Sequence, residues 1–265
     1  MKSPDYSIVI PAYNESVRIV PTLDRVLAYI QQQGWEAEIV VVNDGSRDDT
    51  ADIVRDYAGS NARVRLVENP GNCGKGYSVR NGILHAKGAV VLFTDADLSS
   101  PIEEAAKLLD SIHRGSDIAI GSRWIRPDLQ TTRQPIHRQV LGRAFNLALK
   151  VVLGLSFKDT QCGFKAFKQQ AARDIFGRQV IRRWGFDPEI LFLARQLGYK
   201  TKEIPVAWAH DERSKINPII DGMSMLLDMF RVRWNSVLGK YDYSSLPALA
   251  PTAEAEEVPV GHHRA

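Results

Sequence analysis

Asp95 and Asp97 directly follow the apolar run AVVLF, and their type and spacing suit the binding of a divalent cation. Two carboxylates at the end of a buried strand can share a hard cation that keeps open positions for phosphate oxygens. The alternative is that both aspartates form a turn or cap a helix. Asp44, in NDGS, also follows an apolar run. Three carboxylates are therefore expected at one sheet edge, where a cation or a donor-rich ligand would relieve their repulsion.

A glycine-rich segment, NCGKG at 72–76, is the second group of residues with chemical potential. Glycines let a backbone approach a ligand closely, and a helix N-terminus attracts anions. The phosphate-loop pattern fails, because Asn69 stands where its first glycine is required and Gly76 where Ser or Thr would contact magnesium. A tight turn from strand to helix is the alternative. The sequence also lacks the patterns of serine hydrolases, zinc proteases and dinucleotide dehydrogenases.

The elements that must position these residues follow from the periodicity. Short β-branched runs alternate with helix-period segments from residue 6 to about 121, which predicts an α/β fold with a mainly parallel sheet. Functional groups in such sheets gather at the carboxyl ends of the strands. The expected strands are 6–10, 37–42, 64–67, 89–94 and 117–121, and the expected helices are 17–33, 48–57, 75–86 and 102–114.

After residue 121 the pattern changes. We expect amphipathic helices at about 135–153 and 218–238, a helix near 188–197, and strands within CGFKAF and KTKEIPVAW. The prediction is one domain over 1–240 with two halves, at about 5–121 and about 122–240. Residues 241–265 have the composition of a disordered tail.

Composition excludes several classes of protein. The 265 residues are 44% hydrophobic and 25% charged, which is typical of a globular protein, and the net charge of +3 does not indicate a nucleic-acid binder. The two cysteines, Cys73 and Cys162, show no metal-ligand spacing and favour a reducing compartment. We expect neither a signal peptide nor a membrane-spanning segment, because charges interrupt every long apolar stretch.

The small net charge conceals a basic region. Six basic residues lie from 121 to 150 against one acidic residue, Asp128, for a local charge of +5. The two amphipathic segments combine such charges with apolar residues, so they can lie at a membrane interface or simply cover the sheet. The basic residues are Arg123, Arg126, Arg133, Arg138, Arg143 and Lys150.

Six motifs in order resemble the family 2 glycosyltransferases of GT-A fold, and within them most of all the dolichyl-phosphate glucose and mannose synthases, over about residues 5–240. They are PAYNE at 11–15, NDGS at 43–46, NCGKG at 72–76, TDADLS at 94–99, GSR at 121–123 and DTQCGFKAF at 159–167.

The resemblance implies that the half at about 5–121 binds the nucleotide sugar and that the half at about 122–240 faces the acceptor and the membrane. It also implies a role for each matching residue. Asp97 and Asp95 would bind Mg²⁺ or Mn²⁺, although Ser99 stands where mannosyl relatives often carry a Gln ligand. A loop containing Arg213 would close over the diphosphate. The nucleotide-sugar contacts would be Pro11, Tyr13, Glu15, Asp44, Lys75, Asp95, Ser214 and Lys215. The acceptor phosphate would be held by Arg123, Arg138 and Arg143, and the catalytic residues would be Asp97, Arg123, Arg138 and Asp187.

The resulting expectation is an inverting, metal-dependent glycosyltransferase. It would move glucose from UDP-glucose, or mannose from GDP-mannose, to a dolichyl or polyprenyl phosphate, as a peripheral protein on the cytoplasmic face of the membrane. A phosphate acceptor is already ionised and needs cations more than a base. Two alternatives stay open: a hydroxyl acceptor with Asp187 or Glu189 as base, and a nucleotide-sugar-binding domain without turnover.

Overall fold

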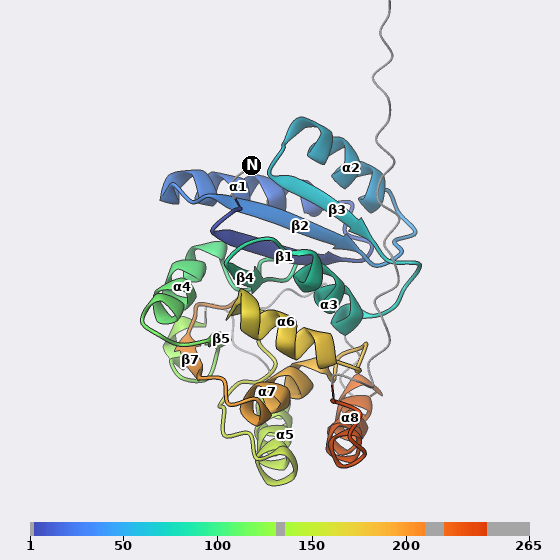
Figure 1. Ribbon diagram of the computed structural model, residues 1–265, viewed down its shortest axis with the longest axis vertical. Helices are drawn as coiled ribbons and strands as arrows, with labels where there is room; N and C mark the ends of the chain where they lie inside the picture. Colours follow the sequence, from blue (N-terminus) through green and yellow to red (C-terminus); the bar gives the residue numbers. More distant parts are fainter. Residues whose placement is uncertain (1–2, 131–135, 210–219, 243–265) are drawn as a thin grey trace, which may run out of the picture.

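The structure is a computed structural model that describes residues 3–130, 136–209 and 220–242, with the side chains of 136–141, 143–144 and 220–221 excepted. Its centre is a seven-stranded sheet with the strand order β3-β2-β1-β4-β6-β5-β7 (Figure 1). The strands are β1 Tyr6–Ala12, β2 Ala37–Asn43, β3 Val64–Glu68, β4 Val90–Phe93, β5 Ile118–Ser122, β6 Lys165–Lys168 and β7 Thr201–Pro205.

Helices connect the strands and cover both faces of the sheet. Two short 3₁₀ helices, Ile102–Glu104 and Pro127–Leu129, complete the described elements. The α-helices are α1 Ile19–Gln33, α2 Thr50–Ser60, α3 Lys75–His85, α4 Ala105–His113, α5 Ile136–Leu153, α6 Gln169–Arg178, α7 Phe186–Gln196 and α8 Ile220–Val237.

Strand side chains alternate between two hydrophobic cores. Val40 and Val42 of β2 belong to the core shared with α3, α5, α6, α7 and α8, whereas Ile39 and Val41 belong to the core shared with α1, α2 and α4. A strand buried on both faces has no polar side, which is why these strands are nearly continuous apolar runs. The α/β fold predicted from the runs is confirmed.

One strand runs against the others. β6 is antiparallel to both of its neighbours, β4 and β5, whereas β1 pairs in parallel with β2 and β4, β2 with β3, and β5 with β7. Lys165, the first residue of β6, therefore pairs with Phe93 and with Ile120, near the carboxyl ends of their strands. The reversal brings the residues before β6 to the edge where the other strands end.

The predicted elements are present, with some shifts. The helix expected at 48–57 begins at Thr50, and the helix expected to start at Pro188 begins at Phe186, which puts Asp187 within its first turn. α6 was not predicted, because it follows β6 without an intervening turn. The sheet takes strands from both predicted halves of the chain. Tyr241, at the start of the predicted tail, is buried instead of disordered, and residues 243–265 lie outside the described residues.

α5 and α8 contact each other at the end of the molecule farthest from α2 and β3 (Figure 1). Both helices bury one face, with Leu149 and Leu153 of α5 and Met229 and Val232 of α8 in the core. The opposite face of α8 is a stripe of apolar side chains that are 59–71% exposed, here called the α8 stripe. It consists of Met223, Leu227, Phe230, Trp234 and Val237.

Part of the predicted apolar surface therefore packs against the sheet and part faces outward. Leu147 and Val151 of α5 are also exposed. Among the residues that the structure describes, every helix is too short or too polar to cross a lipid bilayer.

Candidate active site

Functional side chains converge where β2, β4 and β5 end and β6 begins. Asp44 follows β2, Asp95 and Asp97 follow β4, and Arg123 follows β5. The convergence of the three predicted aspartates on one edge of the sheet follows from these parallel strand ends. Lys165 joins them because β6 starts at the same edge.

Asp95 forms an ion pair with Lys75, the first residue of α3. The Lys75 Nζ lies 2.5 Å from Asp95 Oδ1 and 5.4 Å from the centre of the Trp184 ring. Burial by itself would lower the pKa of Lys75, but the charges of Asp95 and Asp187 outweigh it and raise the pKa. Lys75 is therefore a fixed positive charge beside the carboxylates, which suits a position next to a diphosphate.

Asp97 is the second carboxylate that follows β4. Its Oδ1 accepts a hydrogen bond of 2.9 Å from the backbone N–H of Ser99. Burial raises the pKa of Asp97, and the negative charge of Asp95 raises it further. A neighbouring divalent cation would remove this penalty for the ionised carboxylate.

The residues present fit a magnesium-type site. No group of three or more His, Cys, Asp or Glu side chains that could hold a metal exists within the described parts of the chain. A cation on Asp95 and Asp97 would therefore complete its shell with phosphate and water oxygens, as Mg²⁺ commonly does in sites that bind nucleotides.

Asp44 organises the glycine-rich turn. Its carboxylate is buried and accepts hydrogen bonds from Asn69 Nδ2 at 2.7 Å and from the backbone N–H groups of Cys73 and Gly74 at 2.9 Å. These bonds place Lys75 at the start of α3. Asp44 was predicted to contact the nucleotide; both of its oxygens face the turn.

The PAYNE segment leaves β1 and is fastened to the start of α2. The backbone N–H of Glu15 donates to Thr50 Oγ1 at 2.8 Å, and the N–H of Asn14 donates to Ser46 Oγ at 2.9 Å. Glu15 also forms an ion pair with Arg18. Pro11 pairs with Val42, one residue before β1 ends, and Tyr13 is partly buried. The predicted base and ribose contacts thus lie beside Asp44.

Arg123 is held by Asp159, a residue of the DTQCGFKAF segment. The Asp159 carboxylate accepts from the backbone N–H of Arg123 at 3.0 Å, from its Nε at 2.6 Å and from its Nη2 at 2.8 Å. Although burial opposes both charges, this pairing raises the pKa of Arg123 and lowers that of Asp159. Arg123 also lies 5.3 Å from the Trp208 ring.

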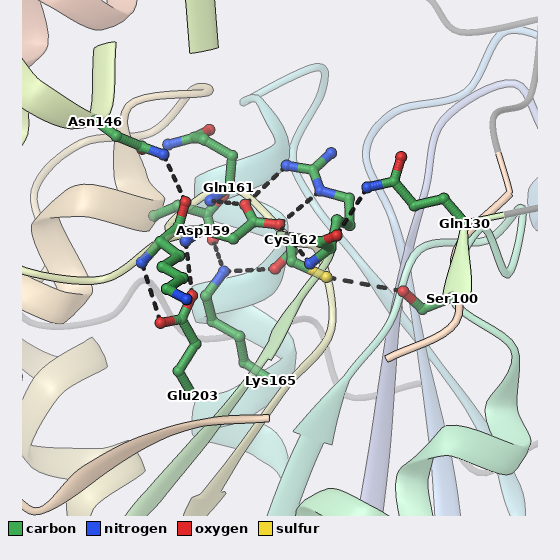
Figure 2. Close-up of polar contacts among 11 residues, drawn as sticks. Ser100, Gln130, Asn146, Asp159, Gln161, Cys162, Lys165 and Glu203 are labelled. Atoms are coloured by element: carbon green, nitrogen blue, oxygen red, sulfur yellow. Dashed lines mark hydrogen bonds and ion pairs between the residues drawn. The ribbon is translucent and has the colours of Figure 1, made fainter. Parts of the chain in front are cut away.

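Figure 2 shows how this pair connects to its surroundings. Asn146 of α5 donates to the carbonyl of Lys158 at 2.6 Å, and Glu203 of β7 accepts from the backbone N–H of Lys158 and of Asp159 at 3.0 and 2.7 Å. Gln130 donates to the carbonyl of Arg123 at 2.7 Å. The guanidinium is therefore positioned by α5 and β7 together.

Asp187 is a buried partner of Lys165. The two side chains form an ion pair, and Lys165 Nζ also donates to the carbonyl of Cys162 at 2.6 Å. Burial raises the pKa of Asp187, although Lys165 and Lys75 oppose this effect. A general base needs to reach a substrate proton. In this structure the Asp187 side chain is only 5% exposed and faces a lysine.

Glu189 is still more deeply buried. It accepts from the backbone N–H groups of Val180 at 3.1 Å and Ile181 at 2.9 Å and from the hydroxyl of Tyr241 at 2.8 Å. Burial raises the pKa of Glu189 to about 7 in spite of these bonds. Both of its oxygens are directed at protein donors.

Several predicted residues lie outside this description. The backbone of Arg138 and Arg143 belongs to α5, but their side chains are not among the described ones. Arg213, Ser214 and Lys215 lie outside the described residues. Their roles remain predictions.

Sequence reasoning assigned no role to Asp159, Lys165 or Trp184, which the structure places at the site. Lys165 carried a signal, because it is a charged residue within the otherwise apolar strand-like segment GFKAF. A buried charge in such a strand requires a partner. No comparable local signal marks Asp159 or Trp184.

The fold is that of the GT-A glycosyltransferases. The glucosyl-3-phosphoglycerate synthase of Mycobacterium tuberculosis, solved with UDP, superposes with a TM-score of 0.60 at 18% identity, covering 92% of this chain and 82% of that one. The same enzyme has been solved with Mn²⁺ and UDP-glucose, and that structure has a TM-score of 0.59 at 19% identity, covering 92% and 80% of the two chains.

The family follows from the sequence comparison. The model of glycosyl transferase family 2 matches residues 7–176, so the chain belongs to this family and is a glycosyltransferase. It is similar to proteins named dolichyl-phosphate beta-glucosyltransferase. The identity is 38% with one from Trichomonas vaginalis, over 85% of this chain and 70% of the relative. It is 35% with that of Saccharomyces cerevisiae and 30% with that of Homo sapiens, each over 89% of this chain and 76% of the relative.

Proposed function

We propose that this chain transfers glucose from UDP-glucose to dolichyl phosphate or another polyprenyl phosphate, with inversion at the sugar carbon. The observation that carries the proposal is the similarity to dolichyl-phosphate beta-glucosyltransferases across most of the chain. A β-linked product from an α-linked sugar nucleotide requires inversion. The names of these relatives favour glucose over mannose as the transferred sugar.

Asp97 and Asp95 are the proposed ligands of Mg²⁺ or Mn²⁺. When bound, the metal would neutralise the charge that develops on the departing diphosphate. Lys75 adds a second positive charge, since its raised pKa keeps the ammonium protonated at neutral pH. Pro11, Tyr13, Glu15 and Asp44 are the proposed surroundings of the base and ribose. Ser214 and Lys215 are proposed to close over the diphosphate.

Arg123, Arg138 and Arg143 are the proposed acceptor-phosphate residues. The Arg123 guanidinium stays charged and is oriented by Asp159, so its position does not have to be reorganised when a phosphate binds. A lipid phosphate is already ionised and needs no base. The engagement of Asp187 by Lys165 and of Glu189 by backbone amides therefore supports a phosphate acceptor over a hydroxyl acceptor.

The lipid acceptor requires access to a membrane. The α8 stripe, with exposed Arg231 and Arg233 beside it, has the composition of an interfacial helix. We propose that α8 lies on the cytoplasmic face of the bilayer and that the protein binds there peripherally. Anionic lipids would interact favourably with both arginines.

The test is a transfer assay with the full chain. UDP-glucose and GDP-mannose, each labelled in the sugar, are incubated with a short polyprenyl phosphate and Mg²⁺, and labelled lipid is measured. We expect product from UDP-glucose, a loss of at least about 100-fold in Asp97→Asn, and little change in Asp110→Asn, which alters an exposed ion pair. Chelation by EDTA should abolish transfer. If neither UDP-glucose nor GDP-mannose gives labelled lipid, the proposal is refuted.

A further inference from the structure

We propose that Glu189 is a positioning residue that links the C-terminal end of α8 to the glycine-rich turn that carries Lys75. Its carboxylate lies between two segments that are far apart in the sequence, Val180–Ile181 on one side and Tyr241 on the other. The Glu189 side chain is completely buried, so these bonds are not exchanged for water.

On the first side, the segment after α6 packs directly on the turn. The Tyr77 N–H donates to the carbonyl of Arg182 at 2.9 Å, and Gln179 Nε2 donates to the carbonyl of Gly76 at 2.9 Å. A Cβ at Gly76 would lie 2.9 Å from the carbonyl oxygen of Ile181, so the two backbones are as close as glycine permits. A shift of residues 180–182 would therefore move the turn.

The glycine-rich turn sets the position of Lys75. Lys75 lies between Gly74, which is bonded to Asp44, and Gly76, which accepts from Gln179. Its ammonium group pairs with Asp95. Glu189 thus acts on the donor side of the site through backbone contacts, without facing the site itself.

On the other side, Tyr241 connects Glu189 to α8. The chain reverses after α8 at Gly239, whose φ of 67° is left-handed, and Lys240 N–H donates to the carbonyl of Asn235 at 3.0 Å. This reversal brings the Tyr241 hydroxyl onto Glu189. The body of α8 also packs closely against the start of α7, because a Cβ at Gly185 would overlap the carboxylate of Asp228.

These contacts connect α8, which carries the α8 stripe, to the turn that carries Lys75. Since the hydrogen bonds join α8 to residues 180–182 and then to residues 74–77, a change in the position of α8 is expected to alter the order of the Lys75 turn. This inference deepens the proposed function by giving α8 an effect on donor binding in addition to lipid contact.

The test uses Tyr241→Phe in the full chain, which removes the hydroxyl and keeps the ring. Hydrogen–deuterium exchange is measured without ligand on peptides that cover residues 74–78 and 179–183. We expect exchange of the Tyr77 and Ile181 amides to become about tenfold faster, because a buried hydrogen bond to a carboxylate is lost. Tyr199→Phe is the matched control, since it removes a tyrosine-to-carboxylate bond to Asp174 outside this network.

Two outcomes would overturn the inference. Faster exchange confined to residues near 241 would show that Tyr241 stabilises only its own segment. An equal rise over the amides of β1 and β2 would show a loss of global stability instead of a local connection.

A kinetic measurement on Tyr241→Phe rests on the proposed function: the KM for UDP-glucose should rise about threefold or more with a smaller change in kcat. Should no donor be used, the exchange experiment still decides the inference.

Discussion

At the scale of single residues, the site is built from opposite charges held in fixed pairs. Asp95 pairs with Lys75, Asp159 with Arg123, and Asp187 with Lys165. The carboxylate of Asp159 and the ammonium of Lys165 are almost completely buried, so the Asp159–Arg123 and Asp187–Lys165 pairs cannot separate without a large desolvation cost. Charges that are already oriented stabilise a developing negative charge without reorganisation.

The carboxylate of Asp95 depends on the small size of Gly163. A Cβ at this position would overlap both carboxylate oxygens of Asp95. We expect Gly163→Ala to displace Asp95 and to lower transfer by at least about tenfold, with little effect on the free energy of unfolding, because only a side-chain end must move. Transfer rates and urea denaturation check both parts. Gly177→Ala, where a Cβ meets nothing, is the control, and equal activity of the two variants would contradict the prediction.

At the scale of elements, α8 has two different faces. Met229 and Val232 pack into the core, whereas the α8 stripe is exposed at positions three or four residues apart. Such a spacing puts the exposed residues on one side of the helix. The same helix therefore belongs to the core and offers an apolar surface, a combination typical of helices that lie on a bilayer.

We expect Leu227→Glu to weaken binding to phosphatidylcholine–phosphatidylserine vesicles by about tenfold or more, because a charge replaces an apolar side chain that would enter the interface. Vesicle co-sedimentation of the full chain measures the effect. Val17→Glu is the control, since Val17 is 84% exposed and lies outside α8. Vesicle binding that is unchanged in Leu227→Glu, or reduced equally in Val17→Glu, would argue against α8 as the contact.

At the scale of the whole molecule, the reversed strand β6 joins the parts. It pairs with β4 and with β5, and Lys165 at its start forms the ion pair with Asp187 of α7. Through Asp159 the preceding segment also holds Arg123. β6 and the segment before it thus connect the strand end that carries Asp95 and Asp97 with Arg123 and with α7.

We expect Lys165→Met to lower the free energy of unfolding by about 3–5 kcal/mol, because it leaves the Asp187 carboxylate buried without its partner. Urea denaturation at neutral pH measures the change. Lys168→Met, on the same strand, removes an ion pair with Asp117 whose lysine side chain is 43% exposed, and its cost should stay below about 1 kcal/mol. Similar losses in the two variants would contradict the proposed importance of burial.

Much of the fold was predictable because its signals are local. β1, β2, β4 and β5 are mostly buried and therefore appear as apolar runs, and Asp44, Asp95 and Asp97 come shortly after the runs of β2 and β4. The position of α6 was not predictable in the same way, since β6 continues into it without a turn residue. The direction of β6 depends on its neighbours and has no local signature.

The sequence by itself determined the α/β class, the family motifs and the gathering of acids at the strand ends, because the periodicity of the chain and the position of the acids after apolar runs are enough for those inferences. Only the tertiary structure decided which charges are paired. Asp187 and Glu189 look alike in the sequence as acids near a helix start, yet one neutralises Lys165 and the other connects Tyr241 to residues 180–181. Segments distant in the chain bury these side chains and supply their partners, so the pairing of buried charges depends on the tertiary structure.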